Sequence, residues 1–231
     1  MPAVWQAATV VAIHPETPNA KTFRLALDTA TRHRAGQHYV VRLTAPDGYT
    51  ASRSYSVAST PDGSTEFELT VERFDDGEVS TFLHDVLEVG DELEVRGPIG
   101  GYFVWDATTP ALLLGGGSGI VPLMAMLRLA RAKGRADLVH LVVSVRGPRD
   151  LYYAHELHAP DASVVYTREA APESTRPPGR LTPDDVVPHL RDDATVYLCG
   201  SASFADTVGD LVTGLGVDPS RIRVERFGPS A

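Results

Sequence analysis

The sequence contains a single cysteine, Cys199, among its 231 residues. One thiol cannot form a disulfide within the chain, and an iron–sulfur cluster usually needs four thiolate ligands. Histidine is more frequent, but only His155 and His158 have a helix-compatible spacing, and no further ligand residues stand near them. We therefore expect neither a built-in cluster nor a metal site.

Long apolar runs and an excess of basic residues are also missing. No run of about 18 apolar residues occurs, and the start from Met1 to Gln6 lacks the basic-then-apolar pattern of a secretory signal. We therefore expect a cytoplasmic protein without a membrane partner. The formal net charge of −9 argues against nucleic-acid binding, which requires a basic surface.

Residues 4–104 consist of short, alternating, β-rich segments separated by turn residues. The predicted strands are Trp5 to Ile13, Thr22 to Leu27, His38 to Leu43, Ser52 to Val57, Phe67 to Arg73 and Glu92 to Arg96. Turn clusters at residues 45–48 and 60–63 punctuate the series, and one helix is predicted at Ser80 to Leu87. Short strands at this spacing predict a small antiparallel β-barrel.

After Trp105 the pattern becomes one of buried strands alternating with helices. The predicted elements are the strand Ala111 to Leu114, the helix Val121 to Ala132 and the strand Leu138 to Val145, with further alternation at Val164 to Tyr166, Pro183 to Leu190, Thr195 to Cys199, Phe204 to Leu215 and Arg221 to Phe227. Such runs predict an α/β domain with a parallel sheet covered by helices on both faces. We expect two domains, at 1–105 and 106–231, and a surface loop at 170–178.

A glycine turn, Gly115 to Gly119, follows the first strand of the second domain and opens its first helix. In that setting backbone amides can approach a pyrophosphate at a helix N-terminus, so nucleotide binding is favoured over a purely structural turn. Pro122 stands where a dinucleotide fingerprint has its third glycine, and Ser144-Val145-Arg146 ends the second strand without an acidic residue. The turn also lacks the Gly-Lys-Ser/Thr ending of a nucleotide triphosphatase loop.

Four motifs, taken in order, resemble those of the ferredoxin–NADP reductase family. They are Arg53-Ser54-Tyr55-Ser56, Gly77-Glu78-Val79-Ser80, the glycine turn with Pro122, and Cys199-Gly200. The resemblance covers nearly the whole chain. It implies that the barrel is a flavin-binding domain, that the α/β domain binds NADP, and that hydride passes from NADPH to FAD before electrons leave for an external acceptor.

The resemblance also implies a flavin site. Its residues are Arg53, Ser54, Tyr55, Ser56, Val71, Arg73, Gly77, Val79, Ser80 and Phe227. A guanidinium suits phosphate, an aromatic face suits the isoalloxazine ring, and the Ser56 hydroxyl would lie near flavin N5. Each residue also has a structural interpretation: an ordinary alternating strand at 53–56, a helix N-cap at Ser80, and a core phenylalanine at Phe227.

On the nicotinamide side the implied residues are Gly116, Gly117, Ser118, Gly119, Arg146, Thr167, Arg168, Arg176 and Gly200. Thr167-Arg168-Glu169 resembles the Ser/Thr-Arg-Glu of NADP-selective members, and guanidinium groups suit a 2′-phosphate. NADPH is therefore expected over NADH, and FAD over FMN. The implied catalytic residues are Ser56, Cys199 and Glu225, although Cys199 also suits a small buried hydrophobe and Arg168 a solvated loop.

The expected acceptor is ferredoxin or another small electron-transfer protein. Arg32-His33-Arg34 is a candidate docking patch, with solvated loop charges as the alternative. A free flavin, a quinone or an oxygenase component would be other acceptors. A subunit that binds flavin and nucleotide for electron transfer without turnover of its own is an alternative of another class. We expect a monomer.

Overall fold

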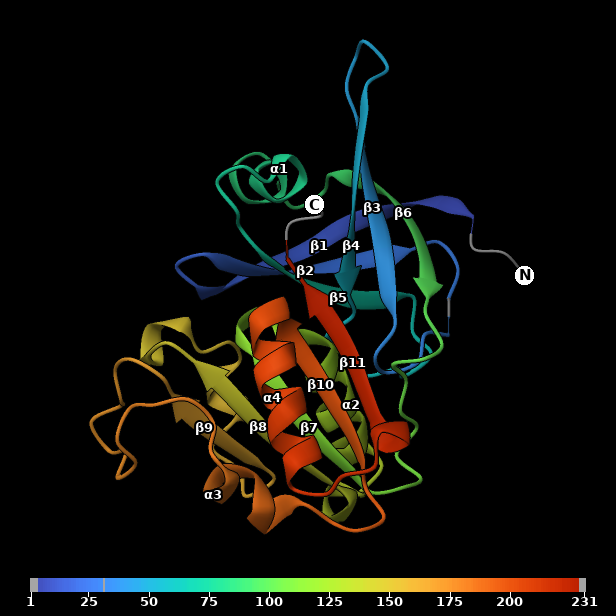
Figure 1. Cartoon of the computed structure of the whole chain (residues 1–231). Coiled ribbons are helices and arrows are strands. Elements are labelled where there is room, and N and C mark those ends of the chain that lie inside the picture. Colours follow the sequence, from blue (N-terminus) through green and yellow to red (C-terminus); the bar gives the residue numbers. More distant parts are fainter. Residues whose placement is uncertain (1–3, 31, 229–231) are drawn as a thin grey trace.

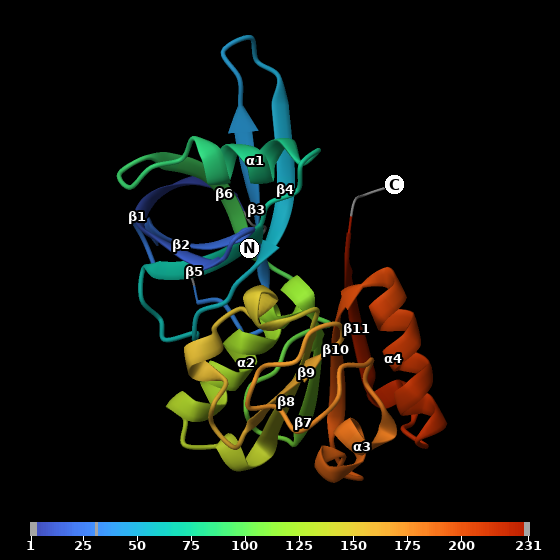
Figure 2. The same ribbon diagram turned by 90° about the vertical axis from the view of Figure 1, so that its left-hand side faces the viewer.

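The computed structural model describes residues 4–30 and 32–228. Their N-terminal part forms a six-stranded antiparallel sheet in the order β4-β3-β6-β1-β2-β5. The strands are β1 (Trp5–Thr17), β2 (Ala20–Leu27), β3 (His38–Thr44), β4 (Thr50–Ser56), β5 (Glu66–Glu72) and β6 (Glu92–Ile99). The sheet curls on itself, and a bridge between Val57 and Leu69 joins its two edges. The predicted antiparallel barrel is confirmed (Figure 2).

The barrel core comes from the alternation of the strands. Phe67, Leu69 and Val71 of β5 are all at most 2% exposed, and they pack with residues of β1 to β3 and β6. Helix α1 (Glu78–Asp85) covers one end of the barrel with Val79 and Leu83. Because side chains alternate along a strand, the residues of β5 between these three point away from the barrel core.

Helix α1 begins two residues earlier than the sequence pattern indicates. Gly77, not Ser80, is its N-cap. The Ser80 hydroxyl donates to the Gly77 carbonyl at 3.0 Å and accepts from the Phe74 amide at 3.2 Å. Ser80 therefore stabilises the turn that leads into the helix instead of capping it.

The C-terminal part is a parallel sheet in the order β11-β10-β7-β8-β9. Its strands are β7 (Ala111–Gly116), β8 (Val139–Val145), β9 (Ala162–Tyr166), β10 (Thr195–Ser201) and β11 (Ile222–Phe227). Helix α2 (Ile120–Ala132) covers the face toward the barrel, while α3 (Pro183–Val186) and α4 (Ala202–Gly214) cover the other face (Figures 1 and 2). The predicted parallel sheet between helical layers is confirmed.

The two sheets are joined by buried contacts as well as by the chain. Arg128 of α2 lies at their junction, where its Nη1 donates to Glu68 of β5 at 3.0 Å and its Nε donates to Glu156 at 3.0 Å. The Tyr197 hydroxyl donates to the Val104 carbonyl at 2.8 Å. The bonds to Glu68 and Val104 tie α2 and β10 to the barrel and to the segment that follows it.

Among the described residues, no helix combines the length and the apolar character that a bilayer crossing requires. The placement of the protein in the cytoplasm stays a prediction.

Candidate functional site

A cleft of about 320 Å³ lies where the barrel meets the parallel sheet. Strands β4 and β5, the start of α1, the glycine turn and the end of β11 all contribute to its walls. The lining residues are Arg53, Ser54, Tyr55, Ser56, Thr70, Glu72, Phe74, Asp76, Gly77, Val79, Ser80, Ser118, Val121, Phe227 and Gly228. We refer to it as the first cleft.

A second cleft, of about 460 Å³, adjoins the first on the other side of β4. It is lined by His38, Val40, Ser52, Arg53, Ser54, Ser56, Glu225, Arg226, Phe227 and Gly228. Five residues line both clefts: Arg53, Ser54, Ser56, Phe227 and Gly228. The junction of the two clefts thus brings the end of the barrel strand β4 against the end of the parallel strand β11.

Strand β4 presents the four residues of its motif to the first cleft. Arg53 is exposed, and its only bond to the described residues runs from Nη1 to the neighbouring Ser52 carbonyl, at 2.8 Å. Burial raises the pKa of the Tyr55 phenol well above its usual value. Ser56 is 5% exposed, and no described residue forms a hydrogen bond with its hydroxyl. The strand therefore offers a free cation, a neutral aromatic ring and an unpaired hydroxyl.

The turn before α1 has no room for a side chain at Gly77. A Cβ there would lie 2.4 Å from the Ser80 Oγ. Gly77, Val79 and Ser80 all line the first cleft at the helix N-terminus, where a phosphate would meet amides and the positive end of the helix dipole. These residues, with Arg53, fit the phosphates of a flavin nucleotide.

Val71 and Arg73, which were expected at the ribityl chain and pyrophosphate, are not among the residues that line the first cleft, so their roles stay predictions. Val71 is 1% exposed in the barrel core, and the Arg73 guanidinium bonds Asp85 at 3.0 Å and Asp75 at 2.8 Å. Because side chains alternate along a strand, Thr70 and Glu72 of β5 line the first cleft in their place. The alternation of Phe67, Leu69 and Val71 in the sequence already contained this signal.

The glycine turn lies against the end of β10 with almost no space between the backbones. A Cβ at Gly119 would lie 2.2 Å from the Cys199 carbonyl oxygen. A Cβ at Gly116 or at Gly200 would lie 2.6 Å from the ring of Phe204, on α4. Gly117 adopts φ +55°, in the left-handed region that favours glycine. The absence of side chains at these glycines therefore allows the turn to pack closely against β10 and α4. The turn lies at the carboxyl edge of the sheet, where nucleotides bind in such folds.

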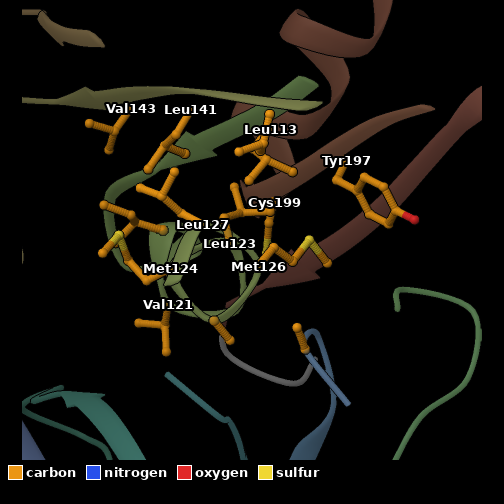
Figure 3. Close-up of a cluster of buried hydrophobic side chains, with 14 of the residues drawn as sticks. Leu113, Val121, Leu123, Met124, Met126, Leu127, Leu141, Val143, Tyr197 and Cys199 are labelled. Carbon is orange, nitrogen blue, oxygen red and sulfur yellow. The ribbon is translucent and has the colours of Figure 1, made fainter. Parts of the chain in front are cut away.

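Cys199 and Glu225 are neighbours in the register of β10 and β11. Cys199 is 0% exposed and packs with Leu123 and Met126 of α2 (Figure 3). Burial, with a contribution from Glu225, raises the pKa of its thiol well above the usual value. Cys199 thus packs in the core as a small buried hydrophobe, which was the alternative interpretation of this residue. Glu225, in contrast, lines the second cleft.

The carboxyl group of Glu225 has an unusually high pKa. Burial raises its pKa to about 7. His38, which the sequence motifs did not indicate, lines the same cleft, and burial lowers the pKa of its imidazole. Both groups are therefore held toward their neutral forms beside Ser56.

The basic residues expected to select NADP divide into two groups. Arg146 and Arg168 are exposed at the carboxyl ends of β8 and β9, and the Arg168 amide donates to the Arg146 carbonyl at 2.9 Å. Within residues 4–30 and 32–228, no bond engages either guanidinium. Thr167 lies beside them, with its amide bonded to Val145. Two exposed arginines whose guanidinium groups have no partner among the described residues thus follow neighbouring strands.

Arg176 differs from these residues because its guanidinium has partners within the protein, and its contact with NADP stays a prediction. Its Nε and Nη2 donate to the Asp185 carboxylate at 2.7 and 2.8 Å, and its remaining hydrogens reach carbonyls of residues 177–180. A guanidinium has five N–H donors, so this set uses all of them. Arg176 therefore fixes the loop at 170–180.

The expected docking patch is only partly a surface feature. Arg32 and Arg34 are exposed, but His33 is 7% exposed and bonds the Ser59 carbonyl at 3.3 Å. Two cations, not three, are thus presented there.

Comparisons with known proteins agree with this geometry. Residues 7–104 match the oxidoreductase FAD-binding domain, and residues 113–210 match the oxidoreductase NAD-binding domain. The ferredoxin–NAD(P)⁺ reductase component of the naphthalene 1,2-dioxygenase/salicylate 5-hydroxylase systems of Ralstonia sp. is 31% identical over 96% of this chain and 69% of its own length. The chain belongs to the ferredoxin–NAD(P)⁺ reductase family.

Two further matches show how much of such proteins the chain represents. The glycine betaine monooxygenase reductase subunit of Chromohalobacter salexigens is 32% identical over 94% of this chain and 63% of its own. The FAD/NAD-binding domain of nitric oxide dioxygenase from Vibrio cholerae superposes with a TM-score of 0.86 at 25% identity, and 97% of this chain and 99% of that one are covered. The chain thus spans about two thirds of the two curated relatives. The family, the two-domain fold and the FAD and NAD(P) cofactors expected from the sequence are confirmed.

Proposed function

We propose that this chain is a flavin-dependent NADPH oxidoreductase, which passes hydride from NADPH to bound FAD and delivers the electrons to an external protein acceptor. Residues 1–105 would hold FAD in the first cleft, and residues 106–231 would hold the nicotinamide nucleotide at the carboxyl edge of the parallel sheet. The observation that carries this proposal is the position of Ser56. Ser56 lines both clefts and its hydroxyl has no hydrogen-bond partner among the described residues, so it would lie where the flavin and the nicotinamide meet.

The residues of the first cleft would hold the flavin by complementary chemistry. Arg53 and the turn at Gly77 would bind its phosphates, and Tyr55 and Phe227 would pack on its ring. When bound, FAD accepts hydride from a reduced nicotinamide and can release the electrons one at a time. Phe227, which lies between the clefts, would exclude water from the ring until the nicotinamide displaces it.

Two residues of the second cleft would take part in the reaction, one as a hydrogen-bond donor to the flavin and one as a proton carrier. The Ser56 hydroxyl would donate to the ring nitrogen that receives hydride, and Glu225 would exchange a proton near neutral pH. Arg146, Thr167 and Arg168 would bind the 2′-phosphate that distinguishes NADPH from NADH. Cys199 would form the packed floor under this end of the sheet.

The acceptor would be a ferredoxin or the oxygenase component of a multicomponent system. Two curated relatives carry the names of oxygenase reductase components, one for a naphthalene dioxygenase and one for a glycine betaine monooxygenase. The chain has one cysteine, so an iron–sulfur relay would lie on a partner or on a segment outside this sequence.

The proposal is tested by purifying the protein and adding NADPH under anaerobic conditions. A yellow protein, or an apoprotein that turns yellow with FAD, should be bleached by NADPH and reoxidised by candidate ferredoxins in a stopped-flow instrument. A protein that cannot bind FAD contradicts the proposal. A flavoprotein that NADPH reduces but no one-electron protein reoxidises would place the acceptor among quinones or free flavins.

A further inference from the structure

A closed ring of hydrogen bonds crosses from the barrel to the parallel-sheet domain behind the wall of the first cleft. The Tyr153 hydroxyl donates to Thr70 Oγ1, and the Thr70 and Thr22 hydroxyls lie 2.7 Å apart. Thr22 donates to Glu16 Oε1 at 2.7 Å, and Glu16 Oε2 accepts the Tyr153 amide at 3.0 Å. We refer to Tyr153, Thr70, Thr22 and Glu16 as the seam ring.

The ring is buried and held by its surroundings. Tyr153, Thr22 and Thr70 are 1%, 3% and 5% exposed. Tyr153 adopts φ +52°, which is uncommon for a residue other than glycine, and the Arg128 guanidinium lies 4.9 Å from the centre of its ring. Burial also raises the pKa of the Tyr153 phenol, which keeps its hydrogen in place. A strained and buried tyrosine is thus maintained at this seam.

The hydrogens of the ring can run in only one order. Each hydroxyl carries a single hydrogen. Thr22 gives its hydrogen to Glu16, so the bond between the two threonines must be donated by Thr70. Thr70 also accepts the hydrogen of Tyr153. Thr70 is therefore left with one lone pair and no hydrogen for any further partner.

Thr70 is also the member of the ring that lines the first cleft. Given FAD in that cleft, as proposed above, we infer that Thr70 contacts the flavin only as a hydrogen-bond acceptor, from an N–H or O–H of the cofactor. Thr22 and Glu16 are positioning residues that keep the Thr70 hydrogen turned away from the cleft. The ring N3–H and the ribityl hydroxyls are the donors that an oxidised flavin offers.

Three substitutions separate this role from simple packing. Thr22→Val keeps the shape of the side chain but removes the oxygen that accepts the Thr70 hydrogen. The Thr70 hydroxyl then turns its hydrogen toward the flavin donor, and two donors that face each other repel. Thr70→Val removes the contact altogether. Tyr153→Phe removes a bond that Thr70 accepts and leaves the Thr70 hydrogen on Thr22, so Thr70 stays an acceptor toward the cleft.

The test is a titration of each apoprotein with FAD, followed by flavin fluorescence and by the absorption spectrum. Thr22→Val and Thr70→Val should each raise the Kd for FAD about fivefold or more, as expected for one lost hydrogen bond, and should shift the flavin absorption bands. Tyr153→Phe should stay within about twofold of the wild type while its Tm falls. Thr22→Ser, which restores the hydroxyl, should recover the wild-type Kd and spectrum.

Matched controls are Thr213→Val, on the exposed face of α4, and Tyr197→Phe, which loses the bond to Val104. An N3-methylated FAD distinguishes the two donors: it should bind the wild type more weakly if N3–H is the partner, and equally if a ribityl hydroxyl is. The inference is overturned if Thr22→Val binds FAD like the wild type, or if all three variants change Kd and Tm in parallel. A wild-type apoprotein that does not bind FAD would instead contradict the proposed function.

Discussion

Glu225 lies beside Cys199 on the neighbouring strand, and the two side chains share one face of the parallel sheet. The thiol is fully buried and the carboxyl group is half-buried, with a pKa of about 7. A carboxyl group with this pKa is half ionised near neutral pH. The same burial that suits it for proton exchange also makes the stability of the fold depend on pH.

The first prediction concerns Glu225→Gln. The folded state holds the Glu225 proton up to about pH 7, whereas the unfolded chain releases it near the ordinary value of 4.5. Between these values the folded state binds more protons, so the free energy of unfolding falls as the pH rises. Glu225→Gln should abolish this pH-dependent fall in the free energy of unfolding. The Tm of the variant should therefore decline less than that of the wild type from about pH 5 to 8.

Glu88→Gln is the control, because Glu88 is exposed after α1. Its Tm should follow the wild-type curve. Parallel curves for Glu225→Gln and the wild type would show that Glu225 does not titrate in this range.

The second prediction concerns the choice of nicotinamide cofactor. Arg168→Ala should raise the KM for NADPH about tenfold and leave the KM for NADH nearly unchanged, because a charge-assisted bond to phosphate contributes about 1.5 to 3 kcal/mol. Arg176→Ala should lower the Tm without changing the ratio of the two KM values, since its guanidinium is committed to Asp185. Steady-state kinetics with both cofactors test this. Equal effects of Arg168→Ala on NADPH and NADH would remove the basis for NADP selectivity.

The sequence alone predicted the layers of the fold and most of the residues that line the first cleft, for a physical reason. Strands and helices have fixed periods, so apolar patterns determine which side faces a core. Motifs such as residues 53–56 carry chemistry in a short stretch of chain, and the structure places all four of these residues on the first cleft. Local information was sufficient in both cases.

Local information was insufficient where a side chain's partner lies on another element of the fold. Arg73 and Arg176 look like ligands for phosphate until the structure shows Asp85 and Asp185 beside them. Thr70 is an ordinary strand residue until Tyr153, 83 positions later, reaches it. His38 gains its place only because β11 brings Glu225 to the same cleft.

The third prediction compares two glycines in the second domain. Gly119→Ala should destabilise the protein by several kcal/mol, on the order of the largest single substitutions, because a Cβ 2.2 Å from the Cys199 carbonyl forces the two backbones apart. Gly209→Ala, in the interior of α4, should stabilise it by about 0.5 to 1 kcal/mol, since its Cβ would have ordinary contacts. Chemical denaturation of both variants tests this. A tolerated alanine at Gly119 would mean that the turn and β10 can separate.

The last prediction concerns Ser56, the hydroxyl shared by both clefts. Ser56→Ala should slow the anaerobic bleaching of bound FAD by NADPH about a hundred- to a thousandfold, which is typical for the loss of one donor to a developing charge. The Kd for FAD should change little, because Arg53, Tyr55 and the Gly77 turn remain. Ser220→Ala, on an exposed turn before β11, is the matched control and should react like the wild type. If Ser56→Ala bleaches at the wild-type rate, the hydroxyl has no part in hydride transfer, and its unpaired position at the junction of the clefts would need another explanation.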